Sequence, residues 1–401
     1  MKILIVSQYF YPESFRINDI ATDWVKRGYD VTVLTGIPNY PMGKFFPGYS
    51  WTKKRTEDWN GIKIIRIPLI ARGHSSVGMV LNYYSFVISG WFWNRFNKVD
   101  ADLVFSFETS PMTQVKVGCG YAKKHRVPHF LYVQDLWPEN VETVTGIHNR
   151  LIIGPIDRMV DKIYKQVDKI FVTSPAFVSA VVNRKKPVDK SKVFYWPQYA
   201  EEYYVPVEKH QYDGIPDDGS FKVVFTGNIG TAQGLDILPE TAKLLTDTNV
   251  KFVIVGDGRY QSEFEKHIDE CNVRDRFIII PRVTPMVIPE VLSACDVGFI
   301  SFNNTSLWEM TIPAKLQSYM ACGKPIIASA SGETKRVIGE ADCGICTEIG
   351  NAEALAEGIK KIMSMDKDKL SYNARKYFES HFDKKMLMDE MDQHLVKGLS
   401  E

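Results

Sequence analysis

The chain contains 401 residues, of which 45% are hydrophobic and 24% charged, and its formal net charge is +1. This length exceeds what one hydrophobic core usually organises, so we expect two domains. The balanced charge argues against a nucleic-acid-binding protein. No apolar run reaches the roughly 18 residues of a membrane-spanning helix. Six cysteines with almost no paired spacing indicate reduced thiols, as in a cytoplasmic protein.

Short apolar runs alternate with helical patterns along the first half of the chain. A helix is predicted over 17–26, with Gly28 ending it. A long loop rich in Pro, Gly and aromatic residues follows over 36–60. Continuous apolar strands separated by helices predict a parallel sheet covered on both faces. The predicted strands are 3–6, 31–34, 62–67, 103–106, 129–133 and 169–172.

The second half repeats this scheme after a polar, turn-rich stretch over 206–220. We therefore predict two doubly wound α/β domains, over 1–205 and 206–380. Helices are expected over 234–245 and 288–294, and the tail over 366–401 is helical in pattern. The tail carries an apolar stripe of Leu387, Met388, Met391 and Leu395. The predicted strands are 221–226, 251–255, 277–280, 297–301 and 325–329.

Ligands of such sheets bind beyond the carboxyl ends of the strands. In the first half, Glu13 and Arg16 follow the first strand, and Asp135 and Glu139 bracket a Trp-Pro turn after the strand 129–133. A carboxylate there can orient a hydroxyl group or accept its proton. Capping of a turn or helix is the alternative for each of these residues. Function is favoured for Asp135.

In the second half, the residues after 221–226 read Gly-Asn-Ile-Gly-Thr-Ala-Gln-Gly and lead into a helix. Glycines let backbone N–H groups approach an anion, and a helix N-terminus adds positive potential. Further candidates follow the next two strands. The residues predicted in these loops to bind a phosphate-bearing ligand are Gly227, Asn228, Gly230, Thr231, Gln233, Gly256, Gly258, Arg282 and Val283.

The stretch 311–329 is predicted to form a loop, a helix and a strand. Pro313 suits a helix start, Gly323 a helix end, and Leu316, Tyr319 and Met320 recur at core-facing spacing. Lys315 then stands at a helix N-terminus, which favours an anion. A solvated lysine in an ordinary α/β unit is the alternative. Together, the glycine loop, Lys315 and Arg282 indicate a nucleotide diphosphate.

These motifs resemble those of family-4 glycosyltransferases with the GT-B fold. The residues that carry the resemblance are 7–16, 38–41, 135–139, 227–234, 255–258 and 313–325. The chain is similar in particular to bacterial O-antigen and capsule transferases of the L-fucosamine-transferase type. The resemblance implies two Rossmann-like domains facing a cleft, with the acceptor on the first and a nucleotide-sugar donor on the second. It also implies retention of anomeric configuration, no metal or other cofactor, and a tail helix over 381–401 that returns to the first domain.

The chain departs from the family pattern at several positions. The family's two glutamates, with seven residues between them, correspond to Met310 and Ser318, with Glu309 as the neighbouring substitute. Asn228 and Gln233 stand where many members carry Arg and Lys, and Gln134 stands where many carry His. Lys315, Arg282 or Arg16 would then supply the positive charge. On this basis Asp135, Lys315 and Arg282 are the expected catalytic residues. Glu309 and Ser318 are expected at the donor, and Glu13, Arg16 and Glu139 at the acceptor.

The resulting hypothesis is a retaining transferase that moves a sugar, such as N-acetyl-L-fucosamine or another HexNAc, from a UDP-sugar to a lipid-linked saccharide. Two alternatives remain: a nucleotide-sugar 2-epimerase, and a degenerate subunit that binds a nucleotide sugar without turnover. The aromatic stretch 77–96 is interrupted by polar residues, so it is expected to be a core helix. The alternative is that its end, with Trp91 and Trp93, binds the inner face of the cell membrane, helped by nearby basic clusters.

Overall fold

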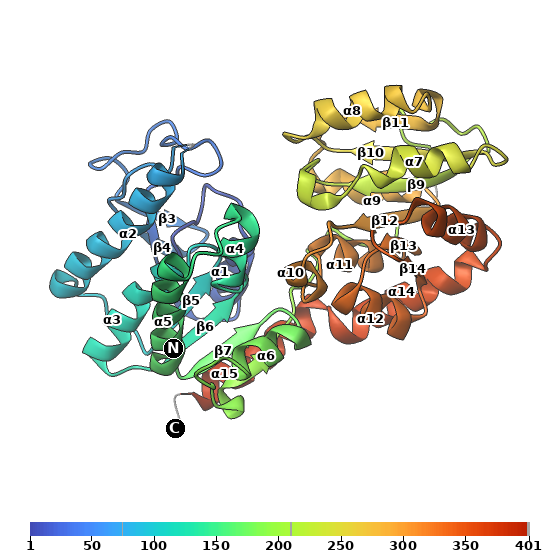
Figure 1. The fold of residues 1–401 in the computed structure, drawn as a ribbon. Coiled ribbons are helices and arrows are strands. Elements are labelled where there is room, and N and C mark those ends of the chain that lie inside the picture. Colours follow the sequence, from blue (N-terminus) through green and yellow to red (C-terminus); the bar gives the residue numbers. More distant parts are fainter. Residues whose placement is uncertain (74, 209–210, 399–401) are drawn as a thin grey trace. The chain divides into compact units, whose positions relative to one another are not determined.

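The computed structural model describes residues 1–73, 75–208 and 211–398. The chain divides into two compact units (Figure 1). Unit 1 comprises Met1–Thr173, Phe177–Trp196 and the tail from Gln393, and unit 2 comprises Ser174–Ala176 and Pro197–Asp392. No helix within the described ranges combines the length and hydropathy needed to cross a membrane.

The boundary between the units differs from the one predicted at residue 205. Trp196 is buried in unit 1, where its ring lies 4.7 Å from that of Tyr132. Two residues later the carbonyl of Gln198 already accepts a hydrogen bond of 2.6 Å from Gln317 in unit 2. Long-range packing therefore ends unit 1 before the polar stretch that suggested the boundary.

Unit 1 is built on one eight-stranded sheet in the order β3-β4-β2-β1-β5-β6-β7-β8. All neighbouring strands are parallel except β3 and β4. The central strands of the sheet, such as β5 and β6, are fully buried, which explains why their sequences are almost continuously apolar. They are β1 (Lys2–Val6), β2 (Asp30–Gly36), β3 (Thr56–Trp59), β4 (Ile62–Ile67), β5 (Leu103–Glu108), β6 (His129–Val133), β7 (Lys169–Val172) and β8 (Val193–Tyr195).

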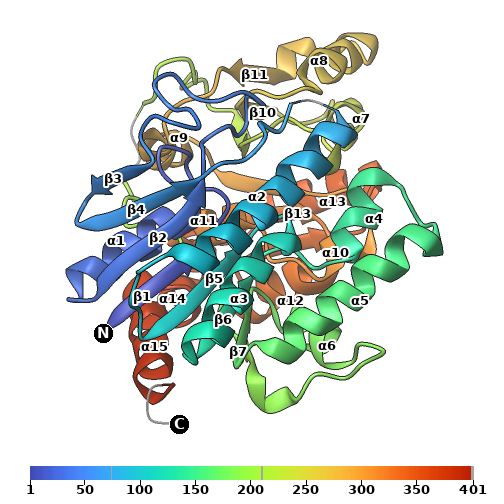
Figure 2. The ribbon, with the colours of Figure 1, turned by 90° about the vertical axis from the view of Figure 1, so that its left-hand side faces the viewer.

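Helices cover both faces of this sheet. Leu4, Val6 and Val104 pack with α2 and α3 on one face, which Figure 2 shows in front of the strands. On the other face Trp24 of α1 meets the ring of Phe105 at 4.9 Å. The helices and 3-10 turns are α1 (Arg16–Lys26), α2 (Ser76–Phe96), η1 (Met112–Gln114), α3 (Val115–His125), α4 (Glu139–Thr145), α5 (Arg150–Gln166), α6 (Pro175–Val182) and η2 (Lys190–Lys192).

Unit 2 has a fully parallel six-stranded sheet in the order β11-β10-β9-β12-β13-β14. Phe225, Phe252 and Ile254 on one face form the core with α7, α8 and α13. On the other face, Tyr319 of α11 packs where Gly298 leaves room for its ring. The strands are β9 (Phe221–Thr226), β10 (Val250–Val255), β11 (Phe277–Ile280), β12 (Val297–Ser301), β13 (Ile326–Ser329) and β14 (Gly344–Thr347).

The helices of unit 2 follow its strands in alternation, as the sequence predicted. The tail, predicted to be helical from 366 on, forms the two helices α14 and α15. Leu387, Met388, Met391 and Leu395 are buried along α15. The elements are η3 (Thr231–Gln233), α7 (Ile237–Leu244), α8 (Gln261–Glu270), η4 (Arg274–Arg276), η5 (Pro285–Val287), α9 (Ile288–Ser293), α10 (Ser306–Glu309), α11 (Ala314–Ala321), α12 (Gly332–Ala341), α13 (Ala352–Met363), α14 (Lys367–His381) and α15 (Lys384–Lys397).

Helix α15 begins at Lys384 rather than at 381 and continues from unit 2 into unit 1. Within unit 1, the ring of His394 lies 5.1 Å from that of Phe171 and 4.5 Å from that of Phe194. The ammonium group of Lys169 also donates to the carbonyl of His394. The predicted tail ended at 401, and its last three positions lie outside the described residues.

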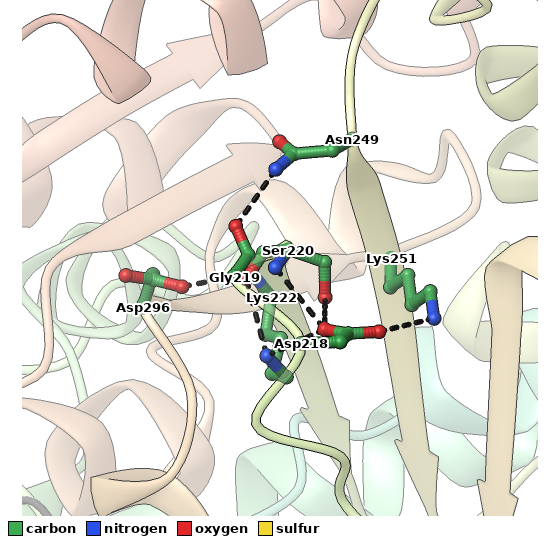
Figure 3. Close-up of polar contacts among 7 residues, drawn as sticks. All are labelled: Asp218, Gly219, Ser220, Lys222, Asn249, Lys251 and Asp296. Atoms are coloured by element: carbon green, nitrogen blue, oxygen red, sulfur yellow. Dashed lines mark hydrogen bonds and ion pairs between the residues drawn. The ribbon is translucent and has the colours of Figure 1, made fainter.

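A polar cluster fixes the chain where it enters the sheet of unit 2 (Figure 3). Asp218 accepts hydrogen bonds from Lys251 at 2.5 Å and from the Ser220 hydroxyl at 2.6 Å. Lys222, at the start of β9, is buried and lies 3.4 Å from Asp218. Lys251, the Ser220 hydroxyl and the other donors around Asp218 hold the pKa of its carboxyl well below its usual range. This end of the sheet is the one opposite the strand carboxyl ends.

Candidate functional site

Each sheet has one point at which the order of its strands reverses. In unit 2 this point lies between β9 and β12, because β10 and β11 extend to one side and β13 and β14 to the other. In unit 1 it lies between β1 and β5. Doubly wound sheets bind ligands at the strand carboxyl ends beside such a point. The loops after these four strands are therefore the places to search for a site.

The glycine loop after β9 is attached to the loop after β12. Asn303 donates from its backbone N–H to the carbonyl of Ala232 at 3.1 Å and from its side chain to Thr231 at 2.6 Å. The Ser301 hydroxyl donates to the carbonyl of Gln233. Gly227, Asn228 and Thr231 remain exposed. The two loops form one surface that solvent and ligands can reach.

Glycine is required here for two different reasons. Gly227 has a φ of +134°, which side chains disfavour, and a Cβ there would lie 3.7 Å from the Lys315 ammonium nitrogen. At Gly256 and Gly258, a Cβ would lie 1.8 Å and 2.1 Å from the backbone oxygens of Gly227 and Ile229. These two glycines were predicted to bind the donor. In the structure they let the loop after β10 pack closely against the glycine loop after β9.

Lys315 lies beside the glycine loop, as predicted. Pro313 is the N-cap residue of α11, and Gly323 follows the helix with a φ of +62°. The Lys315 ammonium group donates to Gln233 Oε1 at 2.6 Å and lies 3.8 Å from the centre of the Phe225 ring.

Among the described residues, no carboxylate forms an ion pair with Lys315. Burial lowers the pKa of Lys315 to about 7. The site therefore holds a desolvated cation whose neighbours are an amide and an aromatic ring. An anionic ligand beside it would supply the missing negative charge.

The other predicted donor residues do not all gather around Lys315. Arg282 is 61% exposed and donates to Asp257 at 2.8 Å, and Val283 is partly buried in the same loop. Glu309 accepts from the Ser331 hydroxyl at 3.1 Å. Ser318 is buried within α11, where its hydroxyl donates to the carbonyl of Ala314. These contacts leave Lys315 and Gln233 as the pair that the fold brings together.

In unit 1, Asp135 lies next to a carboxyl group that the sequence analysis did not select. Asp135 Oδ2 accepts from the Ser110 backbone N–H at 2.8 Å, and its own N–H donates to Glu108 Oε2 at 3.4 Å. Glu108 ends β5 and is fully buried. Burial, and then the charge of Asp135, raise the pKa of Glu108 well above its usual value. The pair therefore combines a buried carboxyl group, whose neutral form burial favours, with the more accessible Asp135.

Glu13 has a structural position that differs from the predicted binding role. It is 3% exposed, and its Oε1 accepts from the backbone N–H groups of Asn39 and Tyr40 at 2.7 Å and 2.6 Å. Burial raises the pKa of Glu13 to about 7. Arg16 begins α1, and its charge opposes the rise in the pKa of Tyr132 that burial produces. Glu13 thus positions the loop over 38–41.

Glu139 begins α4, and its Oε2 is buried with no hydrogen-bond partner among the described residues. The hydroxyl of Tyr164 on α5 is likewise buried without a hydrogen-bond partner among the described residues. Buried polar atoms normally have partners, so these two groups are candidates for ligand contact. Tyr164 lies within α5 and carries no sequence signal of function. Glu108 lies two residues after the predicted strand 103–106, and its place beyond a strand's carboxyl end is the signal that could have identified it.

Two family models match the chain, one in each unit. "Glycosyl transferase 4-like domain" matches residues 14–197, and "Glycosyl transferases group 1" matches residues 208–377. The putative colanic acid biosynthesis glycosyl transferase WcaI of Escherichia coli K12 is 24% identical over 97% of this chain and 98% of its own length. The probable glycosyltransferase WbjE of Pseudomonas aeruginosa is 26% identical over 68% of each chain.

Solved structures of similar fold cover nearly the whole chain. Sucrose-phosphate synthase from Thermosynechococcus elongatus has a TM-score of 0.76 and 17% identity, and covers 99% of this chain and 98% of its own. Anabaena HepE, solved in complex with UDP, has a TM-score of 0.72 and 16% identity, and covers 99% of this chain and all of its own. These neighbours show that the fold is GT-B, as predicted.

Proposed function

Because the chain belongs to the family-4-like, group 1 glycosyltransferases of GT-B fold, we propose that it transfers a sugar from a UDP-sugar to a lipid-linked saccharide with retention of configuration. The proposal places this reaction in the synthesis of a bacterial surface polysaccharide such as O-antigen or capsule, at the cytoplasmic face of the cell membrane. The relative WcaI, described as a putative colanic acid biosynthesis glycosyl transferase, supports this context. The donor sugar is proposed to be a HexNAc, with N-acetyl-L-fucosamine as the first candidate.

One observation carries the proposal: the desolvated ammonium group of Lys315 beside the glycine loop, at the point of strand reversal in unit 2. Backbone N–H groups, a helix start and a cation together suit a diphosphate. UDP complexes of the fold neighbour HepE support a uridine nucleotide as donor. Unit 1, with Asp135 and Glu139, is proposed to bind the acceptor.

In the proposed reaction the bond between the sugar's anomeric carbon and the diphosphate oxygen breaks, and a bond to the acceptor oxygen forms on the same face. The electron pair of the broken bond stays on UDP, where Lys315 stabilises the added charge. The acceptor hydroxyl loses its proton to Asp135 or to the departing phosphate oxygen. The proposed steps use the protein's side chains and the substrate's own phosphate, and no metal is invoked.

Acceptor-dependent release of UDP tests this function. The protein should release UDP from a UDP-HexNAc when a polyprenyl-diphosphate-linked saccharide is added, and the product should keep the donor's anomeric configuration. UDP release with epimerised sugar and no acceptor would instead support a 2-epimerase. Donor binding without turnover under any acceptor would support the degenerate binding subunit.

The affinity for UDP is expected to fall as the pH rises above about 7. The pKa of Lys315 in the ligand-free protein is about 7, and a bound diphosphate raises it, so UDP binding takes up a proton above this value. Calorimetric titration between about pH 7 and 9 covers a range where the terminal phosphate, with a pKa near 6, is already ionised. Lys315→Met should bind weakly and lose this pH dependence. A wild-type affinity that is constant over this range would contradict the role of Lys315.

Helix α2, expected to be a core helix, buries Phe86 with Asn82 and Asn94 on one face and presents many apolar side chains to solvent. Asn82 is fully buried, where its side chain donates to the carbonyl of Ile70 at 2.6 Å, and Asn94 donates to Val117. Trp93 stacks on Tyr121 rather than pointing outward. Trp91 is 64% exposed. The exposed stripe consists of Val77, Val80, Leu81, Tyr84, Ile88, Trp91, Phe92 and Phe96.

Basic side chains lie at the aromatic end of this stripe. Arg95 and Lys98 are exposed, and Lys124 of the neighbouring α3 donates to the carbonyl of Asn94 at 2.5 Å. By contrast, Arg184 of another basic cluster forms ion pairs with Asp157 and Asp161, which neutralise its charge. A continuous exposed apolar face marks an interaction surface. We therefore assign the α2 stripe to the surface of an anionic membrane, where a lipid-linked acceptor resides.

Flotation with vesicles tests the membrane contact. The protein should float with anionic vesicles at low salt and less so at high salt, because each basic residue adds about 1 kcal/mol near such a surface. The double variant Trp91→Ala/Phe92→Ala should stay at the bottom of the gradient. Tyr372→Ala, which removes an aromatic side chain 64% exposed on α14, is the matched control and should float. Equal flotation of both variants would contradict the assignment.

A further inference from the structure

Three side chains that commonly bind transition metals meet between α7 and α8. Glu240 lies on α7, His267 on α8, and Cys271 directly after α8. One ligand atom from each lies within 4.8 Å of the others. His267 Nε2 is 3.1 Å from Glu240 Oε1, and Cys271 Sγ is 3.4 Å from the same oxygen. Ligand atoms around one metal ion are spaced in this range, given metal–ligand distances of about 2.0–2.3 Å.

The elements that hold these residues are fixed by the core of unit 2. Leu238 and Ala242 of α7 and Phe264 and Ile268 of α8 are fully buried in one apolar cluster. Cys271 packs against the edge of that cluster. His267 and Cys271 are four residues apart, so they share one side of the helical turn. The three ligand positions are therefore set by the packing of unit 2 itself.

The second ring nitrogen of His267 faces a carboxylate, the kind of neighbour that metal-binding histidines often have. Nδ1 lies 3.7 Å from Asp236 Oδ1, and Asp236 in turn accepts a hydrogen bond from the hydroxyl of Tyr260. A carboxylate on the outer nitrogen orients the ring and strengthens the inner nitrogen as a ligand. This arrangement directs Nε2 toward Glu240 and Cys271.

The two carboxylate oxygens of Glu240 face different groups. Lys243 binds one carboxylate oxygen, Oε2, at 3.1 Å, so Oε1 remains for the cluster. A metal that binds Cys271 as its thiolate displaces the thiol proton.

We propose that Glu240, His267 and Cys271 form a binding site for a divalent transition-metal ion, with Zn²⁺ as the preferred ion. Thiolate and imidazole ligands select zinc over magnesium and calcium, which prefer oxygen ligands alone. Three protein ligands leave the fourth tetrahedral position to water or another small ligand. A bound ion joins α7 to α8, and α7 begins three residues after Gly234, the last residue of the glycine loop. The site is independent of the proposed transfer reaction and needs no role in it.

Titration of metal-free, tag-free protein with Co²⁺ tests the site, because thiolate-bound tetrahedral cobalt absorbs in the near ultraviolet and visible. The wild type should develop both bands at one equivalent, and Zn²⁺ should remove them. Zn²⁺, but not Mg²⁺, should also raise the melting temperature. Cys271→Ser should lose the near-ultraviolet band, and His267→Ala and Glu240→Gln should bind at least tenfold more weakly.

Cys346→Ser is the matched control, because Cys346 is also partly buried and lies on β14, outside the cluster. It should keep the wild-type spectrum and the zinc-dependent rise in melting temperature. Absence of a thiolate band in the wild type would overturn the proposal. A band that survives in Cys271→Ser would also overturn it, since another cysteine would then hold the metal.

Discussion

Lys315→Ala is expected to lower the turnover number by about 10²–10³-fold, the effect of removing one donor that stabilises a developing negative charge. Lys315 is the cation that the fold places against the glycine loop, 2.6 Å from Gln233 Oε1. The folded protein should be retained, because burying this ammonium group costs free energy in the absence of an anion. Steady-state kinetics with a UDP-sugar, together with the melting temperature, measure both effects.

A matched control for this variant is Lys335→Ala, which removes an exposed lysine from α12 in the same unit. It should leave turnover and melting temperature unchanged. Lys315→Arg keeps the charge but changes its shape, so partial activity is expected. Near-normal turnover in Lys315→Ala would contradict a role of this residue in the mechanism. Other groups would then stabilise the charge on the diphosphate.

Asp135→Asn is expected to reduce transfer by about 10²–10⁴-fold, the usual contribution of a general base. UDP affinity should stay unchanged, because Asp135 belongs to unit 1 and the proposed nucleotide contacts belong to unit 2. Asparagine retains an oxygen that can accept from the Ser110 N–H, so the turn should persist. Transfer rates and calorimetric UDP titration, measured on the same preparation, separate the two effects.

Glu108→Gln provides the comparison for this prediction. Glu108 is expected to be protonated already, so a neutral amide of the same shape should reduce transfer far less than Asp135→Asn does. If UDP affinity and transfer fall together in Asp135→Asn, the residue supports the fold or the donor. If Glu108→Gln reduces transfer as much as Asp135→Asn does, Glu108 and Asp135 share the proton taken from the acceptor, and both carboxyl groups take part in the reaction.

Elements with a strong local pattern were predicted from the sequence within a few residues. The buried strands, the helix of Lys315 and the stripe of α15 are examples, because burial on a parallel sheet or a helix face imposes a short-range period on side-chain polarity. Gly323 was likewise identified, since its positive φ is a local requirement. The edge strands β3, β8 and β14 were missed, because edge positions are only partly buried and their polarity does not repeat clearly.

The sequence by itself determined the two α/β halves, the glycine loop and the lysine that lies beside it, because each is encoded in adjacent residues. Only the tertiary structure decided which distant groups meet. It paired Arg282 with Asp257, placed Glu108 against Asp135, turned Glu13 into a loop support and exposed the apolar face of α2. Contacts between residues far apart in the chain depend on sheet order and helix orientation, which local patterns of polarity do not specify.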